Sequence, residues 1–329
     1  MENKAVRFHT TGGPEVLQWD TVPMAEAGSG EVVVRVIAAG LNYIDTYQRS
    51  GYYPLAGLPS PIGMEAAGEI YAIGPDVSGW QVGEMVAYVT GTPGACTRYH
   101  TVPADRLIRV PAGIAPETAA GMMLKGMTAR YLLRETYPVQ AGDTILVHAA
   151  AGGVGSILVQ WAHHLGATVI GTVGSPEKAE QVRQYGCDHI IQYRHESVSQ
   201  RVAEITDGAG VAVVYDSVGN DTFHDSLLCL RPRGMMVTFG QSSGAISAFD
   251  PVVLSQRGSL FLTRPTLFHY VAAREALEAN AADLFAVVAS GAVTIPVRHT
   301  YPMQDTGEAH RALQARETTG SVILVPGEA

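Results

Sequence analysis

Cysteine is scarce in this sequence. Only three cysteines occur among 329 residues, Cys96, Cys187 and Cys229, and they show no CxxC spacing. Their odd number and wide spacing exclude a disulfide framework, a dithiol redox pair and a zinc site built on paired cysteines. The sequence therefore predicts three free or buried thiols in a reducing compartment.

Long apolar runs and a leader-like start are also missing. The most apolar early segment, residues 31–41, is interrupted by Arg35. No other segment reaches the roughly 18 apolar residues that a membrane-spanning helix needs. The first residues, Met1 to Lys4, mix both charges and precede no apolar stretch, so no secretory signal is expected. These absences favour a cytoplasmic protein with no membrane partner.

Basic residues are in the minority. Lys+Arg number 22 against 31 Asp+Glu, the formal net charge is −9, and no basic run occurs. Proteins that follow a phosphate backbone need clustered cations, so nucleic acid is not expected as the main partner. Glycine is plentiful by contrast, with 36 residues, and proline contributes 18. Much of the backbone must therefore turn tightly or approach another group closely.

The pattern of apolar residues and turns divides the chain into a β-rich part and an α/β part. The first 120 residues predict short strands between Gly and Pro breaks, at residues 5–8, 17–19, 31–38, 66–73 and 84–89. A helix is predicted over 116–133. Strands then alternate with helices, the strands at residues 144–149, 168–173, 189–192, 211–216, 235–239 and 259–262, the helices at 154–165, 176–185, 197–206 and 221–230.

This alternation predicts right-handed βαβ crossovers and a doubly wound parallel sheet. The remaining segment predicts helices over 271–290 and 305–315 and a last strand over 321–325.

A glycine-rich turn joins the strand at 144–149 to its helix. Residues 150–155 read A-A-G-G-V-G, the dinucleotide fingerprint with Ala in the first glycine place. Gly152 would let the backbone approach a pyrophosphate, and Gly155 would let helix and strand pack closely. A simple tight turn would use the same glycines, but a strand before and a helix after favour a cofactor site. The expected cofactor-binding residues of this turn are Ala151, Gly152, Gly153 and Val154.

The phosphate preference of this site follows from the next strand, 168–173. No acidic residue ends that strand, where an NAD site normally carries one for the ribose 2′-hydroxyl. Ser175 is expected to cap the following helix, with Pro176 at its first position and Lys178 in its first turn. A 2′-phosphate would meet a hydroxyl, backbone N–H groups and an ammonium, so NADPH is favoured over NADH. The alternative is an ordinary capped helix with a solvated lysine.

Three further residues are expected at the adenosine end. Gly174 lies between the strand and the capped helix. Tyr193 and Arg194 follow the third strand, where they either flank the adenine or form an exposed loop.

The glycine turn and its surroundings resemble a known family. Residues 142–155, G-D-T-I-L-V-H-A-A-A-G-G-V-G, with Gln160 further on, are similar to the signature of quinone oxidoreductases of the zeta-crystallin type. These are zinc-free medium-chain dehydrogenase/reductases, and the bacterial NADPH-dependent members are the most similar. The likeness covers nearly the whole chain, through residues 12–17, 42–47, 124–128, 215–219 and 263–265. One departure is His163, where the family usually has Lys, Arg or Ser.

The resemblance implies an α/β architecture with a GroES-like β-rich catalytic domain and a Rossmann doubly wound parallel sheet. The catalytic domain is expected at 1–125, the NADPH-binding domain at 126–262, and a segment that completes the catalytic domain at 263–329. The resemblance also implies a homodimer with its active site in the interdomain cleft.

The zinc ligands of related dehydrogenases are replaced in this sequence. Zinc-dependent relatives have Gly-His-Glu where this chain has Gly63-Met64-Glu65, and a cysteine where it has Asn42, three residues before Asp45. An amide and a thioether cannot replace thiolate and imidazole at a catalytic zinc. The four-cysteine structural lobe is absent too, so no metal is predicted.

The resemblance also implies roles for individual side chains. Asn42 and Tyr47 are expected beside the nicotinamide, Thr128 near its carboxamide, and Tyr52 and Arg264 at the acceptor pocket. Asn42 alternatively only caps a turn, and the tyrosines are alternatively core aromatics. Further positions that match cofactor contacts in the family are Ser217, Phe239, Gly240, Arg264 and Arg316.

Three functions are weighed. The first is metal-free hydride transfer from NADPH to a quinone, an acceptor that needs only orientation and donors for its developing oxyanion. The second is NADPH-dependent reduction of α,β-unsaturated aldehydes, ketones or enoyl thioesters, which shares the fold and the hydride chemistry. The third is an NADPH-binding structural or RNA-binding protein, and the charge of −9 counts against RNA.

Overall fold

The computed structural model describes residues 2–327. Its contacts define two compact units. The first unit comprises residues 2–127, 271–289 and 295–327, and the second comprises 128–270 and 290–294. The domain boundaries expected at 125/126 and 262/263 stay a prediction, because packing contacts do not test where an independently folding domain begins.

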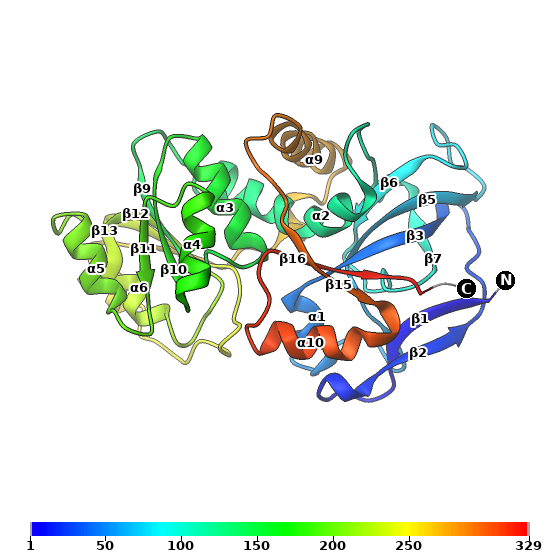
Figure 1. Ribbon diagram of the computed structural model, residues 1–329, viewed down its shortest axis with the longest axis horizontal. Helices are drawn as coiled ribbons and strands as arrows, with labels where there is room; N and C mark the ends of the chain where they lie inside the picture. The colour runs from blue at the N-terminus through cyan, green and yellow to red at the C-terminus, as the bar shows by residue number, and fades with distance from the viewer. Residues whose placement is uncertain (1, 328–329) are drawn as a thin grey trace. The chain divides into compact units, whose positions relative to one another are not determined.

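The first unit consists mainly of strands, drawn in blue, cyan and red in Figure 1. They are β1 (Asn3–Phe8), β2 (Leu17–Val22), β3 (Glu31–Leu41), β4 (Ser60–Pro61), β5 (Glu65–Ile73), β6 (Met85–Val89), β7 (Tyr99–Pro103), β8 (Leu107–Arg109), β15 (Val297–Pro302) and β16 (Ser321–Val325). One sheet has the order β2-β1-β4, and the other has the order β15-β16-β3-β5-β6-β8 with β7 paired to β3. Val322 of β16 lies opposite Leu41 of β3. The C-terminal strand thus completes the N-terminal sheet.

Helices of the first unit flank these strands. They are α1 (Tyr43–Arg49), α9 (Arg274–Ala289) and α10 (Thr306–Gln314), with single turns η1 (Pro14–Val16), η2 (Ala104–Arg106) and η4 (Met303–Asp305). Helix α2 (Pro116–Tyr131) begins in the first unit and ends in the second.

The second unit is built on six parallel strands. In spatial order they are β11 (His189–Gln192), β10 (Thr168–Val173), β9 (Thr144–Val147), β12 (Val211–Asp216), β13 (Leu230–Thr238) and β14 (Phe261–Thr263). All neighbouring pairs are parallel. The order reverses between β9 and β12, which is where doubly wound sheets bind ligands. The predicted parallel sheet is confirmed.

Helices connect the strands of this sheet and flank its first and last strands in the sequence (Figure 1). They are η3 (Leu132–Thr136), α3 (Gly153–His164), α4 (Pro176–Gln184), α5 (Val198–Ile205), α6 (Phe223–Cys229), α7 (Val252–Gln256) and α8 (Leu267–Tyr270).

Several elements differ from the sequence-based prediction, and three of the differences have a clear physical reason. Helix α1 was not predicted, because its buried side chains are Asp45, Thr46, Gln48 and Arg49, which give no apolar period. The strand predicted to reach residue 149 ends at Val147, since Ala149 adopts φ +50° to enter the glycine turn. Strand β13 begins at Leu230, where a helix was expected to end.

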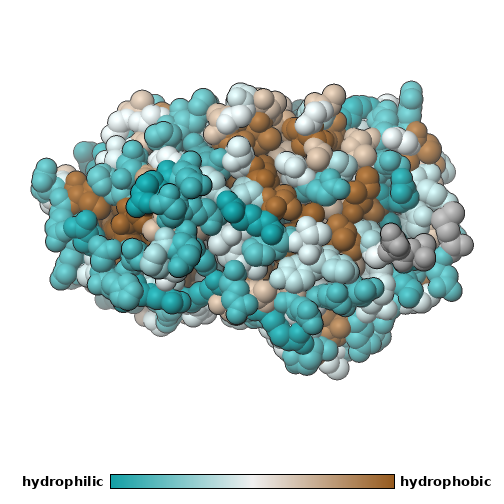
Figure 2. All heavy atoms as spheres, in the orientation of Figure 1, coloured by the Kyte–Doolittle hydropathy of each residue, from teal (hydrophilic) through white to brown (hydrophobic). Residues whose placement is uncertain are grey.

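The surface is mixed, and hydrophilic residues cover most of the face seen in Figure 2. Among residues 2–327, no helix has the length and apolar character to cross a membrane. Two of the exposed large hydrophobic side chains are predicted site residues, Tyr52 at 49% and Tyr193 at 38% exposure.

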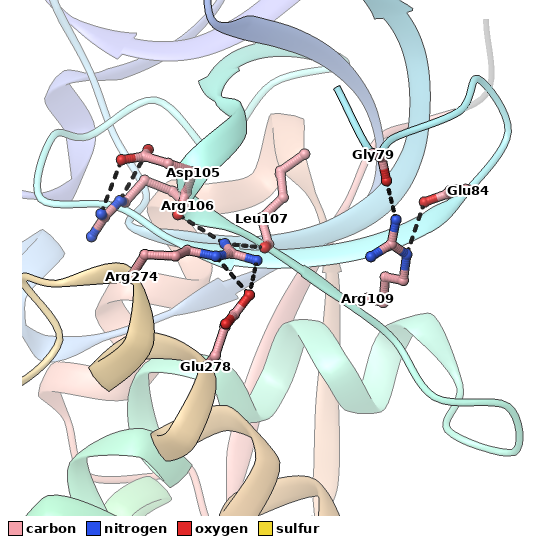
Figure 3. Close-up of polar contacts among 8 residues, drawn as sticks. All are labelled: Gly79, Glu84, Asp105, Arg106, Leu107, Arg109, Arg274 and Glu278. Carbon is pink, nitrogen blue, oxygen red and sulfur yellow. Dashed lines mark hydrogen bonds and ion pairs between the residues drawn. The ribbon is translucent and has the colours of Figure 1, made fainter. Parts of the chain in front are cut away.

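Two arginines hold α9 against the N-terminal strands. Arg274 Nη1 donates to the carbonyls of Asp105 at 2.8 Å and Leu107 at 2.6 Å. Arg106 Nη1 in turn donates to the carbonyls of Val271 and Ala272, both at 3.1 Å. Figure 3 shows the Arg274 guanidinium between α9 and the backbone of η2 and the start of β8. Each segment thus satisfies backbone groups of the other.

We expect Arg274→Met to lower the free energy of unfolding by about 1 to 3 kcal/mol, because it leaves two backbone carbonyls without a charged donor. Urea unfolding followed by circular dichroism measures this change. Arg35→Met is the control, since the Arg35–Glu69 pair is exposed and is expected to contribute less than about 1 kcal/mol. Equal losses in both variants would contradict the anchoring role of Arg274.

Candidate active site

The carboxyl ends of the parallel strands bring together most of the predicted cofactor residues. Because the six strands run in one direction, the segments that follow them lie along one edge of the sheet. The predicted residues that follow β9 to β14 there are Ala151–Val154 after β9, Gly174, Ser175 and Lys178 after β10, Tyr193 after β11, Ser217 after β12, Phe239 and Gly240 after β13, and Arg264 after β14.

The glycine turn after β9 opens helix α3. Gly152 caps the helix in an extended conformation, and its N–H donates to the Ala149 carbonyl at 2.8 Å. A Cβ on Gly155 would lie 2.3 Å from that same carbonyl oxygen, so only glycine fits there. The first turn of α3 carries no acidic residue. Its N–H groups and the positive end of its dipole therefore suit an anion.

A buried network of polar side chains lies next to this turn. His148 Nδ1 lies 3.1 Å from Thr172 Oγ1, and its Nε2 lies 3.0 Å from Ser226 Oγ. Ser226 donates to Asp216 Oδ2 at 3.0 Å. Asp216 Oδ1 accepts from the N–H groups of Val218 at 2.7 Å and of Gly219. The network ties the turn after β9 to the loop after β12, which carries Ser217.

This serine, histidine and aspartate do not form a nucleophilic triad. The serine proton is directed to the carboxylate, whereas a nucleophile would donate to the histidine. Burial lowers the pKa of His148, which keeps the ring neutral. Sequence reasoning missed this network because its members are spread over the turn after β9, the strands β10 and β12 and the helix α6.

The start of α4 is built as the sequence predicts. Ser175 is the N-cap of α4, its Oγ accepts from Lys178 N at 3.4 Å, and Pro176 occupies the first turn. A Cβ on Gly174 would lie 2.6 Å from Tyr193 Oη, so this glycine makes room for the tyrosine.

The first turn of α4 also carries an acidic residue, Glu177. A hydrogen bond from Ser175 lowers the pKa of Glu177, which places that carboxylate beside the cap.

The ends of β12, β13 and β14 meet at Gly240. A Cβ there would lie 2.6 Å from the Ser217 carbonyl oxygen. Arg264 Nη1 donates to the Gly240 carbonyl at 3.4 Å and to Thr238 Oγ1 at 3.3 Å, and its Nη2 donates to Gln241 Oε1 at 2.9 Å. Arg264 thus lies over this corner of the sheet edge. Phe239, half-buried, donates its N–H to the Asp216 carbonyl.

Asn42 stands where β3 passes into α1 in the first unit. Its backbone N–H donates to Asp45 Oδ2 at 2.7 Å, and its side-chain Nδ2 donates to Glu65 Oε1 at 2.8 Å. Asn42 therefore does cap helix α1, and its side-chain amide also forms a hydrogen bond with Glu65. Burial raises the pKa of Asp45 to about 7.

A group of tyrosines surrounds Tyr47 on α1. Its ring centroid lies 6.0 Å from that of Tyr52 and 5.2 Å from that of Tyr53. The exposed Tyr52 presents an aromatic surface to solvent. Tyr53 was not singled out in the sequence, since only the fold brings its ring against Tyr47.

The two remaining predicted residues lie apart from this group in sequence. Arg316 follows α10 with φ +62°, and its charge acts on the Tyr43 hydroxyl, whose pKa burial raises. Thr128 is buried on α2.

A buried arginine fixes α1 to α10. Arg49 is 2% exposed. It donates to the Gly12 carbonyl at 3.1 Å, to His310 Nδ1 at 3.1 Å and to Gln314 Oε1 at 3.0 Å. Burial, together with the Arg49 charge, lowers the pKa of His310 to about 3. The helix that carries Tyr47 is thus held by a neutral histidine.

Known proteins match both units. A family model described as an alcohol dehydrogenase GroES-like domain matches residues 28–132, and one described as a zinc-binding dehydrogenase matches residues 153–286. A quinone oxidoreductase of Pseudomonas aeruginosa is 49% identical over 323 residues, which cover 98% of this chain and 99% of that protein. This chain belongs to the quinone oxidoreductase family.

Two further relatives bear on the activity. The crystal structure of Escherichia coli quinone oxidoreductase complexed with NADPH has a TM-score of 0.96 at 45% identity, covering 98% of this chain and 100% of that one. A 2-haloacrylate reductase of a Burkholderia species is 44% identical over 328 residues, covering 98% of each chain. The predicted family and the combination of a GroES-like domain with a Rossmann-type sheet are confirmed.

The family positions that hold zinc in dehydrogenases do not fit zinc in this member. The Asn42 amide donates to Glu65, and the Met64 thioether accepts from Gln48 Nε2 at 3.4 Å. Burial and nearby carboxylates raise the pKa of Cys96 well above its usual range, so its thiol stays protonated. Among residues 2–327, no cluster of three or more His, Cys, Asp or Glu is suited to a metal ion.

The buried His310 predicts a pH dependence of stability. Its pKa in the folded state, about 3, lies below the ordinary 6.5, so the unfolded chain takes up the proton first as the pH falls. Its contribution is complete above pH 6.5 and is lost as the pH falls toward 3, by at most about 1.4 kcal/mol per pH unit.

We expect His310→Gln, which keeps an acceptor for Arg49, to flatten the fall in the free energy of unfolding between about pH 6 and pH 4. Urea unfolding at several pH values measures the slope. His164→Gln, at an exposed position, is the control. An unchanged slope in His310→Gln would show that another group carries the acid sensitivity.

Proposed function

We propose that this chain is an NADPH:quinone oxidoreductase that transfers hydride without a metal. The observation that carries this proposal is the single sheet edge on which the glycine turn, the capped helix α4 and the loops after β11 to β14 converge. That edge has no acidic residue at the end of β10, where an NAD-specific site places one. Full-length similarity to quinone oxidoreductases, one of them complexed with NADPH, supports the same assignment.

NADPH, when bound, supplies the hydride, and a proton from solvent or the protein completes the quinol. The turn Ala151–Val154 would receive the pyrophosphate against the N–H groups of α3. Ser175 and Lys178 would bind the 2′-phosphate, and Tyr193, which packs against Gly174, would flank the adenine. Ser217, Phe239, Gly240, Arg264 and Arg316 are the other residues that we assign to the cofactor.

The acceptor side is assigned to the tyrosine group of the first unit. Asn42 and Tyr47 would lie beside the nicotinamide, with Thr128 near its carboxamide. Tyr52, with its exposed ring, suits a flat aromatic acceptor, because offset aromatic stacking adds to the burial of area. Arg264 would supply a positive charge for the developing oxyanion.

Zinc-independence rests on the donor set described above, which holds an amide and a thioether in place of thiolate and imidazole. We extend the proposal to a homodimer, as the family resemblance implies, and to a cytoplasmic location, which the sparse cysteines and the lack of long apolar runs favour. The exposed Phe261 on the edge strand β14 would supply apolar contact area for the second copy.

A second function is favoured by one relative. The 44% identical 2-haloacrylate reductase takes its name from an acceptor with an activated carbon–carbon double bond. Such an acceptor needs the same hydride geometry, so an enone or enal is the alternative substrate class.

Oxidation of NADPH by the purified protein after chelator treatment tests the proposal. We expect turnover with 1,4-benzoquinone and 9,10-phenanthrenequinone, resistance to the chelator, and much lower rates with NADH. Turnover with an enone or enal alone would move the assignment to double-bond reduction. NADPH binding without turnover of any acceptor would favour a structural role.

We expect Lys178→Ala to weaken NADPH binding by roughly 1.5 to 3 kcal/mol, the range for a charged hydrogen bond, with little effect on NADH. Fluorescence titration with each cofactor measures the dissociation constants. Arg183→Ala, in the last turn of the same helix, is the matched control. Equal losses for NADPH and NADH would remove the 2′-phosphate assignment.

A further inference from the structure

A buried ion pair lies behind the Asn42 side chain, and the steps proposed so far do not use it. Glu65 Oε1 lies 2.8 Å from Lys125 Nζ. The two residues are 0% and 5% exposed. Removal of two charges from water costs several kcal/mol per ion, so a buried pair is weak evidence for stability. Its position beside a proposed active-site residue suggests another role.

The Glu65 carboxylate has a single orientation. Its Oε1 accepts from both Lys125 and Asn42 Nδ2, and its Oε2 accepts from the Leu124 N–H at 2.6 Å. Gly40 gives it room, because a Cβ at that position would lie 2.2 Å from Oε1. Glu65 is the first residue of β5, and its partners lie at the β3–α1 junction and on helix α2. Three parts of the fold therefore fix the position of this carboxylate.

The Glu65 carboxylate determines which group of the Asn42 amide, the oxygen or the NH₂, faces it. A carboxylate only accepts hydrogen bonds, so the amide must turn its NH₂ toward Glu65. The Gly40 carbonyl, 3.4 Å from Nδ2, is a second acceptor on the same side. The amide oxygen therefore points away from both. A neutral partner with an oxygen and an NH₂ of its own would accept either orientation.

We propose that Glu65 and Lys125 are positioning residues that hold the Asn42 amide in one orientation for the hydride-transfer step. Lys125 balances the carboxylate charge inside the fold, and Glu65 fixes the amide. This inference rests on the proposed function, in which Asn42 lies beside the nicotinamide. Loss of the orientation is expected to slow the chemical step and to leave binding at the adenosine end unchanged.

The decisive variant is the double substitution Glu65→Gln with Lys125→Met, studied in the full chain. It replaces the ion pair by neutral side chains of similar length, which buried sites commonly tolerate. We expect an unchanged melting temperature within a few degrees, an NADPH dissociation constant within about threefold, and a kcat with 9,10-phenanthrenequinone lowered at least about tenfold. Wild-type kcat in this variant would overturn the proposal.

A double-mutant cycle separates positioning from an independent effect. If the pair acts through Asn42, adding the double substitution to Asn42→Ala lowers kcat no further. If the triple variant instead loses kcat by the product of the two separate factors, the proposal is contradicted. Glu84→Gln with Arg109→Met, which removes an exposed pair of the same unit, is the matched control and is expected to leave kcat unchanged.

Glu65→Gln alone is the second variant if the double variant does not fold. The fixed backbone N–H of Leu124 would then take the glutamine oxygen, which turns the glutamine NH₂ toward Asn42 and drives the amide to flip. We expect a larger loss of kcat than in the double variant, and Lys125→Arg, which keeps the charge, to retain most of the activity. A wild-type kcat in Glu65→Gln would overturn the proposal.

The emission of bound NADPH distinguishes failure of this inference from failure of the proposed function. A wild-type protein that binds NADPH but reduces no acceptor contradicts the proposed function only. Positioning is then tested by the nicotinamide emission, which the double variant and Asn42→Ala should change alike and non-additively. Lys178→Ala should change the affinity without changing this emission. An unaltered emission in the double variant would overturn the positioning role.

Discussion

Parallel pairing of β9 with β10 and β12 is the constraint on which the candidate site depends. Because all six strands of the second unit run in one direction, each chain segment that leaves a strand emerges at the same edge. The order reversal between β9 and β12 opens that edge for a ligand. Predicted cofactor residues between positions 151 and 264 converge there. Because α3 and α4 begin at this edge, their amino ends supply N–H groups and helix dipoles there without any additional element.

Buried polar groups give both units their specific geometry. His148 with Asp216 ties two loops of the sheet edge, Arg49 with His310 holds α1, and Glu65 with Lys125 holds Asn42. These groups add little net stability once their desolvation is counted. Their hydrogen bonds are directional, however, so they place loops and side chains that apolar packing would leave free to shift. The proposed metal-free site depends on such placement, because no metal–ligand geometry would organise it.

Local signals explain which features were predictable. The cap at Ser175 with Pro176, and the bounds of β10, β11 and β12, follow from short-range residue preferences and apolar runs. Helix α1 was missed because its inward side chains are polar and find partners on distant elements. The Asn42 contact with Glu65 and the packing of Tyr53 on Tyr47 join residues that no local pattern relates.

By itself the sequence determined the alternating architecture, the glycine turn and the absence of an acid after β10, because each depends on residues within one strand–turn–helix unit. It also carried the family resemblance. Only the tertiary structure decided which oxygen of Glu65 meets Asn42, where Arg264 lies, and that the serine, histidine and aspartate of the second unit are structural. Those outcomes depend on directional contacts between segments far apart in the chain, and only the packing of the whole fold sets their distances.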